Sequence, residues 1–549
     1  MAAIERLYRR RVPIDKVVSS ELAKALAQLT LDIRRPLGVL LTRRGQVQEV
    51  IVGTDLTLSS TTMTLFRTSP RSLRGLRFVR TQLQDQPLNQ ESLTDLAFLR
   101  LDLIGILSVT ADGRIGNIYL AHLLPPGSTG QLFKVLKSVP FHALTVSFDV
   151  FIEELESQLQ LARTHHTVGS GKESAILVSA SAKSRAEQEE HLVELSELAT
   201  SAGVTVIDRM AQRTPDGHQR YLLGSGKMKE VLIQTLHRGA DMVIFDQTLS
   251  PAQLRAISEM TDIKVIDRTQ LILDIFARRA HSREGKVQVE LAQLRYLLPR
   301  LSGRGDQLSR LGGGIGTRGP GETKLETDRR RVRNRITHLE RELAQFARHQ
   351  DQRRARRNRY GLPVVSLVGY TNAGKSTLLN VLTNSHVAAQ DRLFETLDTT
   401  SRRLRFPQDR EIIITDTVGF IRDLPQELVG AFRTTLDELR EADLLLHVVD
   451  VNARDIEVQL EAVVGILDEL RLSSVPRWLV FNKCDQAPPQ QVDILCRRFE
   501  AIGISALQPT TLHPLLARLE TYVRSLSVSA DRTHNVLEQD HELTLASRR

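Results

Sequence analysis

The sequence predicts a multidomain α/β protein, and three observations support this fold class. The chain has 549 residues, which is too long for a single hydrophobic core. Strand-like and helix-like segments alternate from about residue 174 to 270 and again after residue 361, which is typical of parallel sheets covered by helices. Between these two regions, apolar residues recur at helical spacing along two stretches, which predicts a pair of long helices.

These patterns divide the chain into five segments. We expect an N-terminal α+β extension, an α/β domain, an antiparallel helical hairpin with a glycine-rich tip loop and a basic linker, a second α/β domain with a phosphate-binding loop, and a polar tail. Their expected boundaries are 1–165, 174–280, 281–360, 361–525 and 526–549.

The composition is that of an ordinary globular protein with a modest positive charge. The 74 Lys and Arg against 65 Asp and Glu give a net charge of +9, which weakly indicates an acidic partner. The chain has only two cysteines, Cys484 and Cys496, too few for a zinc site built from cysteines alone or for a disulfide framework. The N-terminal MAAIERLYRRRVP lacks the apolar core of a secretory signal, and no apolar run is long enough to span a membrane. We therefore expect a cytoplasmic protein without a membrane span.

The N-terminal extension is expected to combine helices and hairpins. Ser20 is placed to cap an amphipathic helix. PLGVLLTRRGQVQEVIVG predicts a hairpin that turns at Arg44-Gly45, and ILSVTADGRIGNIYLAHLL predicts another at Asp112-Gly113, a pair suited to a type I′ turn. No catalytic set is visible in this segment, so we interpret it as a scaffold or docking domain.

The next segment has the pattern of a parallel sheet. AILVSAS, VTVIDRM, DMVIFD and KVIDRTQLIL predict strands, and Ser250 followed by Pro251 predicts a helix start. The fragment Gly224-Ser-Gly226-Lys227 precedes a predicted helix. Its pattern fits a simple helix-start loop or an anion site, and the sequence leaves both open.

Two apolar seams predict the helical hairpin. Their members recur at alternating spacings of four and three residues: Val287, Leu291, Leu294, Leu298 and Leu301, then Val332, Ile336, Leu339, Leu343 and Phe346. Two such helices joined by a loop bury their seams most simply by facing each other in antiparallel orientation.

The stretch between the two helices, GGGIGTRGPGE at 312–322, has glycine at six of its eleven positions. It resembles a phosphate-binding loop, but Glu322 stands where that pattern needs a lysine, and a carboxylate repels phosphates. We expect the bare backbone to be presented to a surface that side chains would block. A purely structural loop is the alternative.

The second helix and its linker are rich in arginine. Between residues 328 and 360 there are twelve arginines against four acidic residues. The run RRARRNR is dense and of one sign, so its charges repel each other, and we expect it to contact a nucleic-acid phosphate backbone. A solvated helix face is the alternative. The candidate RNA contacts are Arg318, Arg353, Arg354, Arg356 and Arg357.

The string VVSLVGYTNAGKSTLLNVL places a complete G-x-x-x-x-G-K-[ST] loop between a strand and a helix. Backbone N–H groups of this loop are expected to face the nucleotide phosphates. Lys375 would reach the β and γ oxygens, and Ser376 would ligate Mg²⁺. The loop comprises Gly369, Tyr370, Thr371, Asn372, Ala373, Gly374, Lys375 and Ser376.

The string EIIITDTVGF predicts a second part of the same site. Asp416 at the strand end would hold Mg²⁺ through water, and the N–H of Gly419 would meet the γ-phosphate. The expected nucleotide contacts here are Asp416, Thr417, Val418 and Gly419, and we expect Lys375 and Gly419 to act in catalysis. Ras-like enzymes have a glutamine directly after this glycine, which orients the attacking water. Here that residue is Phe420, so the free protein is expected to hydrolyse its nucleotide slowly.

The string RWLVFNKCD predicts the base-binding part, with Asn482, Lys483, Cys484 and Asp485. The Asp485 carboxylate can accept hydrogen bonds from N1–H and N2–H₂ of guanine, whereas adenine would leave it unpaired. ISAL, with Ser505, Ala506 and Leu507, can bring a backbone N–H to guanine O6. Together these motifs predict a P-loop GTPase domain at 361–525. Between the phosphate loop and Asp416, RLFETLDTTSRRLRF is the candidate switch, where Thr396, Thr399 and Thr400 all suit a Mg²⁺ ligand.

Taken in order, these strings resemble the HflX family of GTPases over about residues 174–525. The strings are VIDRTQLILDIFARRAHSREGKVQVELAQLRYLLPRL, GGGIGTRGPGETKLETDRRRVRNRI, GYTNAGKST, FETLD, DTVGF and NKCD. The resemblance implies an HflX-type nucleotide-binding-like domain at 174–280. It also implies a GTPase that binds the large ribosomal subunit and its rRNA, with a role in dissociating or rescuing stalled ribosomes under stress.

The resemblance further implies that FETLD is the switch, which selects Thr396 as the second Mg²⁺ ligand beside Ser376. The implied switch contacts to the nucleotide are Phe394, Glu395, Thr396, Leu397 and Asp398. We expect Mg²⁺ as cofactor, GTP or GDP and the large subunit as partners, and a monomer. The alternatives are an RNA-binding scaffold with a vestigial GTPase and an ATP-dependent remodeller of RNA.

Overall fold

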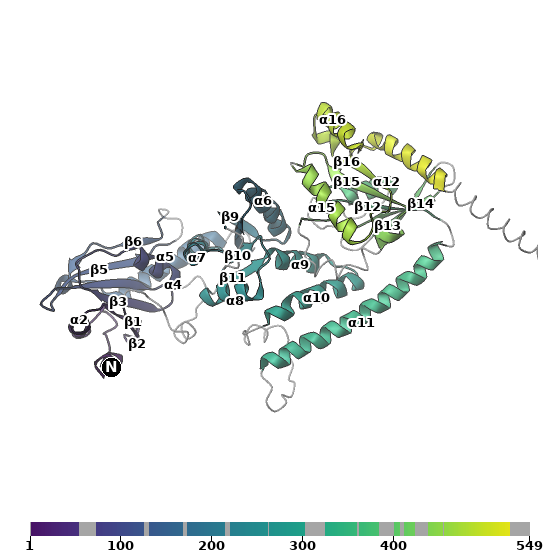
Figure 1. Cartoon of the computed structure of the whole chain (residues 1–549). Coiled ribbons are helices and arrows are strands. Elements are labelled where there is room, and N and C mark those ends of the chain that lie inside the picture. The colour runs from purple at the N-terminus through teal and green to yellow at the C-terminus, as the bar shows by residue number, and fades with distance from the viewer. Residues whose placement is uncertain are drawn as a thin grey trace, which may run out of the picture. The chain divides into compact units, whose positions relative to one another are not determined.

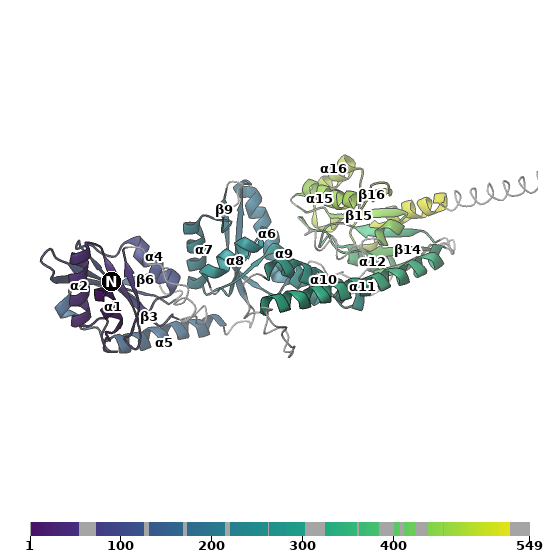
Figure 2. The ribbon, with the colours of Figure 1, turned by 60° about the horizontal axis from the view of Figure 1, so that its bottom comes forward.

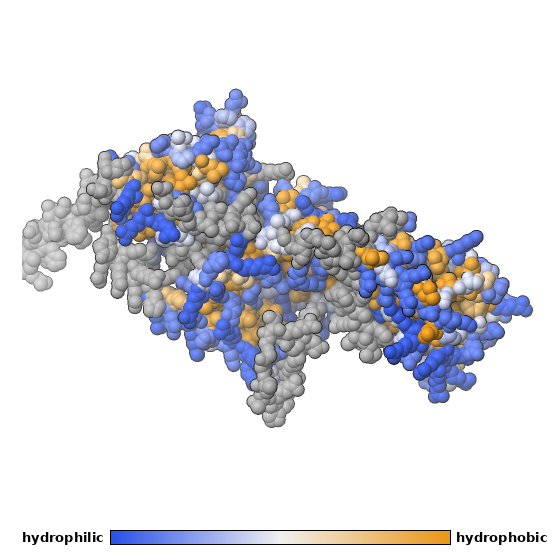
Figure 3. Space-filling view, turned by 180° about the vertical axis from the view of Figure 1, so that it is seen from behind, coloured by the Kyte–Doolittle hydropathy of each residue, from blue (hydrophilic) through white to orange (hydrophobic). Residues whose placement is uncertain are grey.

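The computed structural model divides the chain into two compact units, Met1–Arg268 and Thr269–Arg549. It describes residues 2–53, 73–125, 131–167, 173–214, 220–261, 263–301, 324–358, 362–383, 400–406, 411–422, 438–453 and 455–526. Figure 3 shows one face of the molecule, where hydrophilic side chains are interspersed with apolar ones. Among the described residues, none of the helices combines the length and the apolar character that a membrane span needs.

The N-terminal extension is built around one mixed, seven-stranded sheet with the order β2-β1-β3-β4-β5-β6, in which β7 also pairs with β5. Its strands are β1 (Leu37–Thr42), β2 (Val47–Val52), β3 (Leu76–Gln82), β4 (Leu103–Val109), β5 (Ile115–Leu123), β6 (Phe133–Val135) and β7 (Val139–Pro140). Its helices are α1 (Ala2–Tyr8), α2 (Ser20–Ile33), α4 (Gln90–Leu99), η1 (Phe141–Ala143) and α5 (Phe148–Thr167). The predicted α+β character of this segment is confirmed.

Two local predictions in the extension need correction. The cap of α2 is Ser19, whose side chain accepts a hydrogen bond from Leu22 N, and Ser20 is the first helical residue. The hairpin between β4 and β5 forms, but its turn is not type I′, because only Gly113 has a positive φ, at 82°. Thr110 N donates to Arg114 O across a three-residue loop, which is the geometry of a type I turn followed by a left-handed glycine.

The second domain of this unit is a four-stranded parallel sheet with the order β11-β10-β8-β9, as predicted. Its elements are β8 (Ser174–Ser181), α6 (Arg185–Ser201), β9 (Thr205–Arg213), α7 (Ser225–His237), β10 (Met242–Phe245), α8 (Pro251–Met260) and β11 (Lys264–Asp267). Ser250 caps α8 and Pro251 occupies its first turn, so that prediction is confirmed. KVIDRTQLIL is not one strand: β11 ends at Asp267, and α9 (Arg268–Arg279) begins at the next residue.

The predicted helical hairpin is present in the second unit. It consists of α10 (Arg283–Leu297), the short turn η2 (Leu298–Arg300) and α11 (Lys324–Asn358), and Figures 1 and 2 show α10 beside the much longer α11. Seam residues from both helices form one apolar cluster: Val287, Leu291, Leu294, Ile336, Leu339, Leu343 and Phe346. Three ion pairs with N···O separations of 2.7–2.8 Å cross the seam: Arg283–Glu342, Arg295–Glu340 and Arg335–Glu290.

The last domain is a six-stranded sheet with the order β13-β14-β12-β15-β16-β17, parallel except for the edge pair β13–β14. Its strands are β12 (Val364–Val368), β13 (Thr400–Arg405), β14 (Glu411–Asp416), β15 (Leu444–Asp450), β16 (Arg477–Asn482) and β17 (Ile502–Gly503). Its helices are α12 (Lys375–Thr383), η4 (Glu438–Glu441), α15 (Ile456–Glu469), η5 (Cys484–Gln486), α16 (Pro489–Phe499), η6 (Pro509–Leu512) and a final helix at 513–526. Parallel strands bring their carboxyl ends to one edge, so the loops after β12, β14 and β16 share that edge.

Candidate nucleotide site

The phosphate loop after β12 has a backbone that only glycine allows at its two ends. Gly369 has a φ of 148°, and a Cβ there would lie 2.1 Å from the carbonyl oxygen of Val448 on β15. Gly374 has a φ of 86°, and its Cβ would lie 2.3 Å from Nδ2 of Asn482. The loop therefore passes directly over the ends of the neighbouring strands, where its N–H groups can face a ligand.

Lys375 lies at the start of α12 and is only 6% exposed. Its ammonium group donates hydrogen bonds to the carbonyl oxygens of Gly369 at 3.1 Å and Tyr370 at 2.8 Å. Burial lowers the pKa of Lys375 to about 8, against the opposing effect of the Asp416 carboxylate. A buried cation held over the phosphate loop is positioned to compensate phosphate charge.

Ser376 and Asp416 lie together, although they come from different elements. The Ser376 hydroxyl donates to Oδ2 of Asp416 at 2.6 Å, and the Asp416 side chain is fully buried. A hydroxyl oxygen and a carboxylate oxygen are hard ligands of the kind that Mg²⁺ takes, so these two residues fit the metal. The next residue, Thr417, uses its hydroxyl to donate to the carbonyl of Leu367 at 2.7 Å, which fixes the end of β14 against β12.

The segment after β14 is hydrogen-bonded to the phosphate loop, a feature that the sequence did not reveal. Thr371 N donates to Phe420 O at 2.8 Å, and Phe420 N donates to Gly369 O at 3.1 Å. A Cβ on Gly419 would lie 2.8 Å from Cγ2 of Thr371, so this glycine permits the close approach. The Phe420 side chain is 1% exposed. The site thus has a buried aromatic ring where a polar residue could otherwise orient water.

The predicted base-binding residues meet at the same edge. Asn482 joins two loops, because its Nδ2 donates to Ala373 O and its Oδ1 accepts from Ala506 N, both at 2.9 Å. The Ser505 hydroxyl donates to Oδ1 of Asp485 at 2.6 Å, which orients that carboxylate. These bonds connect the phosphate loop, the Asn-Lys-Cys-Asp motif and the loop after β17 into one structure.

Three further residues that the sequence assigned to the base site are Lys483, which forms an ion pair, Cys484, which is partly buried, and Leu507, which is exposed. Lys483 has a φ of 63°, and its ammonium group lies 2.7 Å from Oδ2 of Asp450. Cys484 donates its thiol hydrogen to Phe481 O at 3.4 Å, and burial raises its pKa to about 11, which leaves it an unreactive thiol. Leu507 is 70% exposed. Asp450 was missed in the sequence, although a carboxylate ending a buried strand at this edge could have indicated it.

Several predicted site residues lie outside the described residues. These are the implied switch residues Phe394, Glu395, Thr396, Leu397 and Asp398, the candidate Thr399, and the glycine-rich stretch 312–322 with Arg318. Thr400 starts β13 and pairs with Asp416 in the sheet register. Arg353, Arg354, Arg356 and Arg357 belong to helix α11, but the placement of their side chains is outside the described part of the chain.

The Gly224-Ser-Gly226-Lys227 fragment begins α7, with Gly224 as its cap. Lys227 lies on the helix surface, where it pairs with Glu230 at 2.9 Å. This arrangement favours the helix-start interpretation of the fragment, since the lysine contacts its own helix.

The fold and the site together define a P-loop GTPase. A curated relative from Caldanaerobacter subterraneus, described as "GTPase HflX", is 51% identical over 314 residues, which cover 57% of this chain and 73% of that protein. A second, from Alkalihalophilus pseudofirmus and of the same description, is 46% identical over 63% of this chain and 83% of its own length. The chain belongs to the HflX family of GTPases, enzymes that hydrolyse GTP to GDP and phosphate.

Three family models match successive parts of the chain. A "GTP-binding GTPase N-terminal" model matches residues 189–277, and a "GTP-binding GTPase Middle Region" model matches 279–357. A "50S ribosome-binding GTPase" model matches 364–483. Among solved structures, a GTP-binding protein from Sulfolobus solfataricus in complex with GDP is 25% identical, with a TM-score of 0.36 over 64% of this chain and 99% of that one.

Proposed function

We propose that this chain is a Mg²⁺-dependent GTPase that binds the large ribosomal subunit in the cytoplasm and couples its nucleotide state to ribosome dissociation or rescue. The match of residues 364–483 to a family of 50S ribosome-binding GTPases supports the ribosome as partner. The observation that supports coupling between GTP hydrolysis and ribosome binding is the buried Phe420 beside the phosphate loop. Its side chain offers no polar group to the attacking water.

In this proposal the chain's own residues bind and position the nucleotide. Lys375 and the loop N–H groups stabilise the negative charge on the β and γ phosphates, and the Gly419 N–H contacts the γ-phosphate. Mg²⁺, when bound, would neutralise further charge, and Ser376 and Asp416 would hold it. Asp485, oriented by Ser505, would select guanine through its N1–H and N2–H₂ groups.

The missing polar group would then come from a partner. A group supplied in trans, such as an arginine, accelerates hydrolysis by about 10³–10⁵ in related enzymes. The arginine-rich end of α11 would hold the chain on this partner, because arginines bind a phosphate backbone. The chain would therefore hydrolyse GTP slowly alone and fast when docked on its ribosomal partner.

Single-turnover hydrolysis tests this proposal. GTP turnover is measured at saturating protein with and without purified large subunits, and with small subunits as the matched control. We expect strong acceleration by large subunits only. Equal rates in all three conditions would reject completion of catalysis by the ribosome, and a preference for ATP over GTP in the same assay would support the RNA-remodelling alternative.

A further inference from the structure

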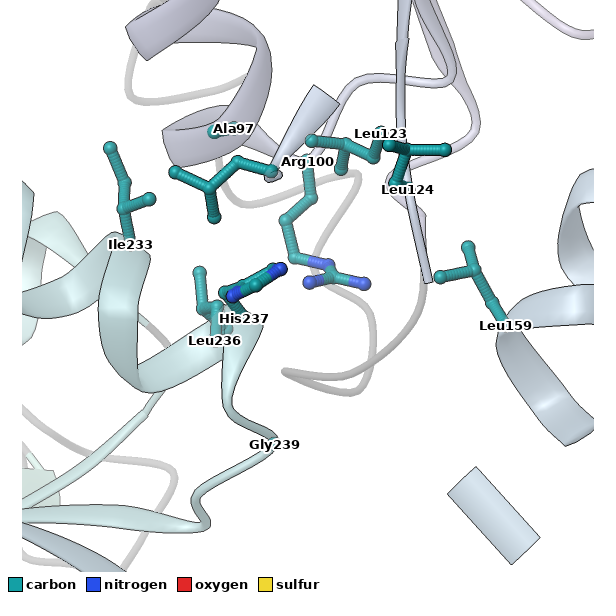
Figure 4. Close-up of a pocket in the computed structure, with 10 residues that line it drawn as sticks. Ala97, Arg100, Leu123, Leu124, Leu159, Ile233, Leu236, His237 and Gly239 are labelled. Atoms are coloured by element: carbon teal, nitrogen blue, oxygen red, sulfur yellow. The ribbon is translucent and has the colours of Figure 1, made fainter. Parts of the chain in front are cut away.

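The first compact unit contains a small pocket lined mainly by apolar side chains (Figure 4), among them Ala97, Leu123, Leu159, Ile233 and Leu236. Its cavity volume is about 50 Å³, far below the roughly 300 Å³ at which small-molecule sites begin. This pocket is therefore too small to hold a ligand of that size. A carboxylate in the GTPase domain, beside the base-binding motif but not part of it, gives a stronger indication of function.

This carboxylate belongs to Asp450, the last residue of β15. Asp450 is paired in the sheet register with Asn482, the residue at the end of β16 where the Asn-Lys-Cys-Asp motif begins. The next residue, Val451, donates its N–H to Asn482 O at 3.1 Å. Because β15 and β16 are parallel, Asp450 is brought to the edge of the sheet at which the base-binding residues meet.

Both carboxylate oxygens of Asp450 are used, one by the motif and the other by the turn after β15. Oδ2 lies 2.7 Å from the ammonium group of Lys483, and Oδ1 accepts a hydrogen bond from Asn452 N at 2.9 Å. The side-chain Nδ2 of Asn452 lies 3.3 Å from the same Oδ1 and donates to Lys483 O at 3.4 Å. Asp450 therefore restrains the ammonium group of Lys483 directly and its backbone through Asn452.

Lys483 needs such a restraint because of its backbone conformation. Its φ of 63° and ψ of 31° place it in the left-handed region, which a residue with a Cβ adopts only at a cost in free energy. It links Asn482, which is bonded to the phosphate loop, to the Cys484-Asp485 part of the motif. We therefore expect the position of Lys483 to affect how a base fits between these two parts of the site.

We propose that Asp450 is a positioning residue of the nucleotide site, which holds Lys483 so that its four-carbon stem forms one wall of the guanine pocket. This inference rests on the proposed base site. The carboxylate neutralises the ammonium charge, and the CH₂ groups between that charge and the backbone offer an apolar surface to a flat purine ring. Other residues contact the phosphates, so Asp450 would act on binding of the base and not on the hydrolysis step.

Binding of labelled GDP to the full chain, without ribosomes, tests this inference. Asp450→Ala is expected to weaken GDP and GTP binding equally, by about tenfold, and to raise KM by the same factor while kcat changes by less than about twofold. The preference for GTP over ITP is expected to persist, because Asp485 and not Asp450 contacts the amino group of guanine. Asp493→Ala is the matched control, since it removes an exposed carboxylate from α16 of the same domain, and it is expected to bind like wild type.

Two further variants separate positioning of Lys483 from a role in the turn after β15. Asp450→Asn keeps an acceptor for Asn452 N but loses the charge that pairs with Lys483, so it is expected to weaken GDP binding nearly as much as Asp450→Ala. In a chain that carries Lys483→Met, Asp450→Ala is expected to have little further effect, because the ammonium group through which Asp450 acts is already gone.

Wild-type affinity in Asp450→Ala or Asp450→Asn, an undiminished effect in the Lys483→Met chain, or a fall in kcat as large as the rise in KM would each overturn the proposal. Urea unfolding followed by Trp478 fluorescence identifies a variant that folds poorly, and if this is Asp450→Ala, the Asp450→Asn variant decides. Failure of the base site itself is distinguishable, because Asp485→Asn would then leave the preference between GTP and XTP unchanged.

Discussion

The hydroxyl of Tyr370 accepts a hydrogen bond from the backbone N–H of Arg422 at 2.7 Å, which joins the phosphate loop to a segment 52 residues later. The Arg422 guanidinium in turn forms an ion pair with Asp455, so this segment is held from both sides. With the two backbone bonds between the loop and Phe420, three hydrogen bonds hold the segment after β14 against the phosphate loop. We expect nucleotide entry to compete with these bonds.

Tyr370→Phe is expected to accelerate GTP association about fivefold. The change removes one hydrogen bond of about 1 kcal/mol between the phosphate loop and the segment after β14, and it leaves the ring in place. Stopped-flow fluorescence with a labelled GTP measures the rate. Tyr522→Phe is the matched control, because it removes a hydroxyl that donates to Asp443 O at 2.9 Å in the same domain, away from the phosphate loop. Equal association rates for the two variants would show that the Tyr370 bond does not restrain entry.

Lys375→Ala is expected to lower GTP affinity by about one to two orders of magnitude, because it removes a charged donor to the phosphates. Lys227→Ala is the matched control, since Lys227 also follows a glycine at a helix start but pairs with Glu230. Equilibrium binding of labelled GTP distinguishes them. Glu322→Ala is expected to leave affinity unchanged. Loss of binding in either control variant would place nucleotide contacts outside the loop at 369–376.

Asp485→Asn is expected to shift preference from GTP toward XTP, because an amide can donate to the additional oxygen of xanthine. Ser505→Ala provides the comparison: it removes the bond that orients the carboxylate but keeps the carboxylate itself. Its affinity for GTP is expected to fall while its preference for guanine remains. Competition binding with GTP, XTP and ATP measures both effects, and unchanged preference in Asp485→Asn contradicts the assigned base site.

The central strand β15 contains His447, which is 1% exposed and has both ring nitrogens without hydrogen-bond partners among the described residues. Burial lowers its pKa to about 3, and the positive charges of Arg477 and Lys375 contribute. The unfolded chain therefore takes up a proton below about pH 6.5 that the folded chain excludes. Because only the unfolded chain takes up this proton between these pH values, the free energy of unfolding is unaffected above about pH 6.5 and decreases as the pH falls toward 3.

His447→Leu is expected to raise resistance to urea at pH 7 and to flatten its pH dependence between about pH 4 and 6.5. Trp478, the single tryptophan, lies on the neighbouring strand β16, so its fluorescence reports unfolding of this domain. His513→Gln replaces an exposed histidine of the same domain and should change neither quantity. If wild type and His447→Leu lose urea resistance equally as the pH falls, the acid sensitivity arises from groups other than His447.

Replacing Arg353, Arg354, Arg356 and Arg357 together by Gln is expected to weaken cosedimentation with large ribosomal subunits and to reduce its salt dependence, while GTP binding is kept. Each lost phosphate contact lowers the slope of log affinity against log salt by roughly one. A control chain carries the same change at four exposed arginines elsewhere: Arg6, Arg185, Arg255 and Arg497. Equal losses of cosedimentation in the two variants would show that net charge, and not these four positions, explains the effect.

Local rules predicted the features that depend on neighbouring residues. Ser250 and Pro251 were identifiable as a helix start because the cap is formed within four residues. The phosphate loop was placed between β12 and α12 for the same reason. The turn at Asp112-Gly113 was assigned to the wrong type, because the composition of a two-residue turn does not fix the length of its loop.

Contacts between distant residues were beyond such rules. Nothing near Tyr370 in the sequence indicates its hydrogen bond with Arg422. KVIDRTQLIL has the apolar content of a strand, yet α9 starts at Arg268, whose guanidinium pairs with Asp246 and Glu194, two residues that lie far away in the sequence. Such ion pairs form only once the sheet has assembled.

The unequal lengths of α10 and α11 have a mechanical consequence. With 15 and 35 residues, the helices measure about 22 and 52 Å, so more than half of α11 extends beyond the length that α10 can cover. This part carries Arg353 and Arg357, which are four residues apart and repel each other along the helix. A polyanion would remove that repulsion and stiffen the rod. Docking on a polyanion would thereby stiffen the end of α11 that lies nearest in sequence to the GTPase domain, whose first strand begins six residues later.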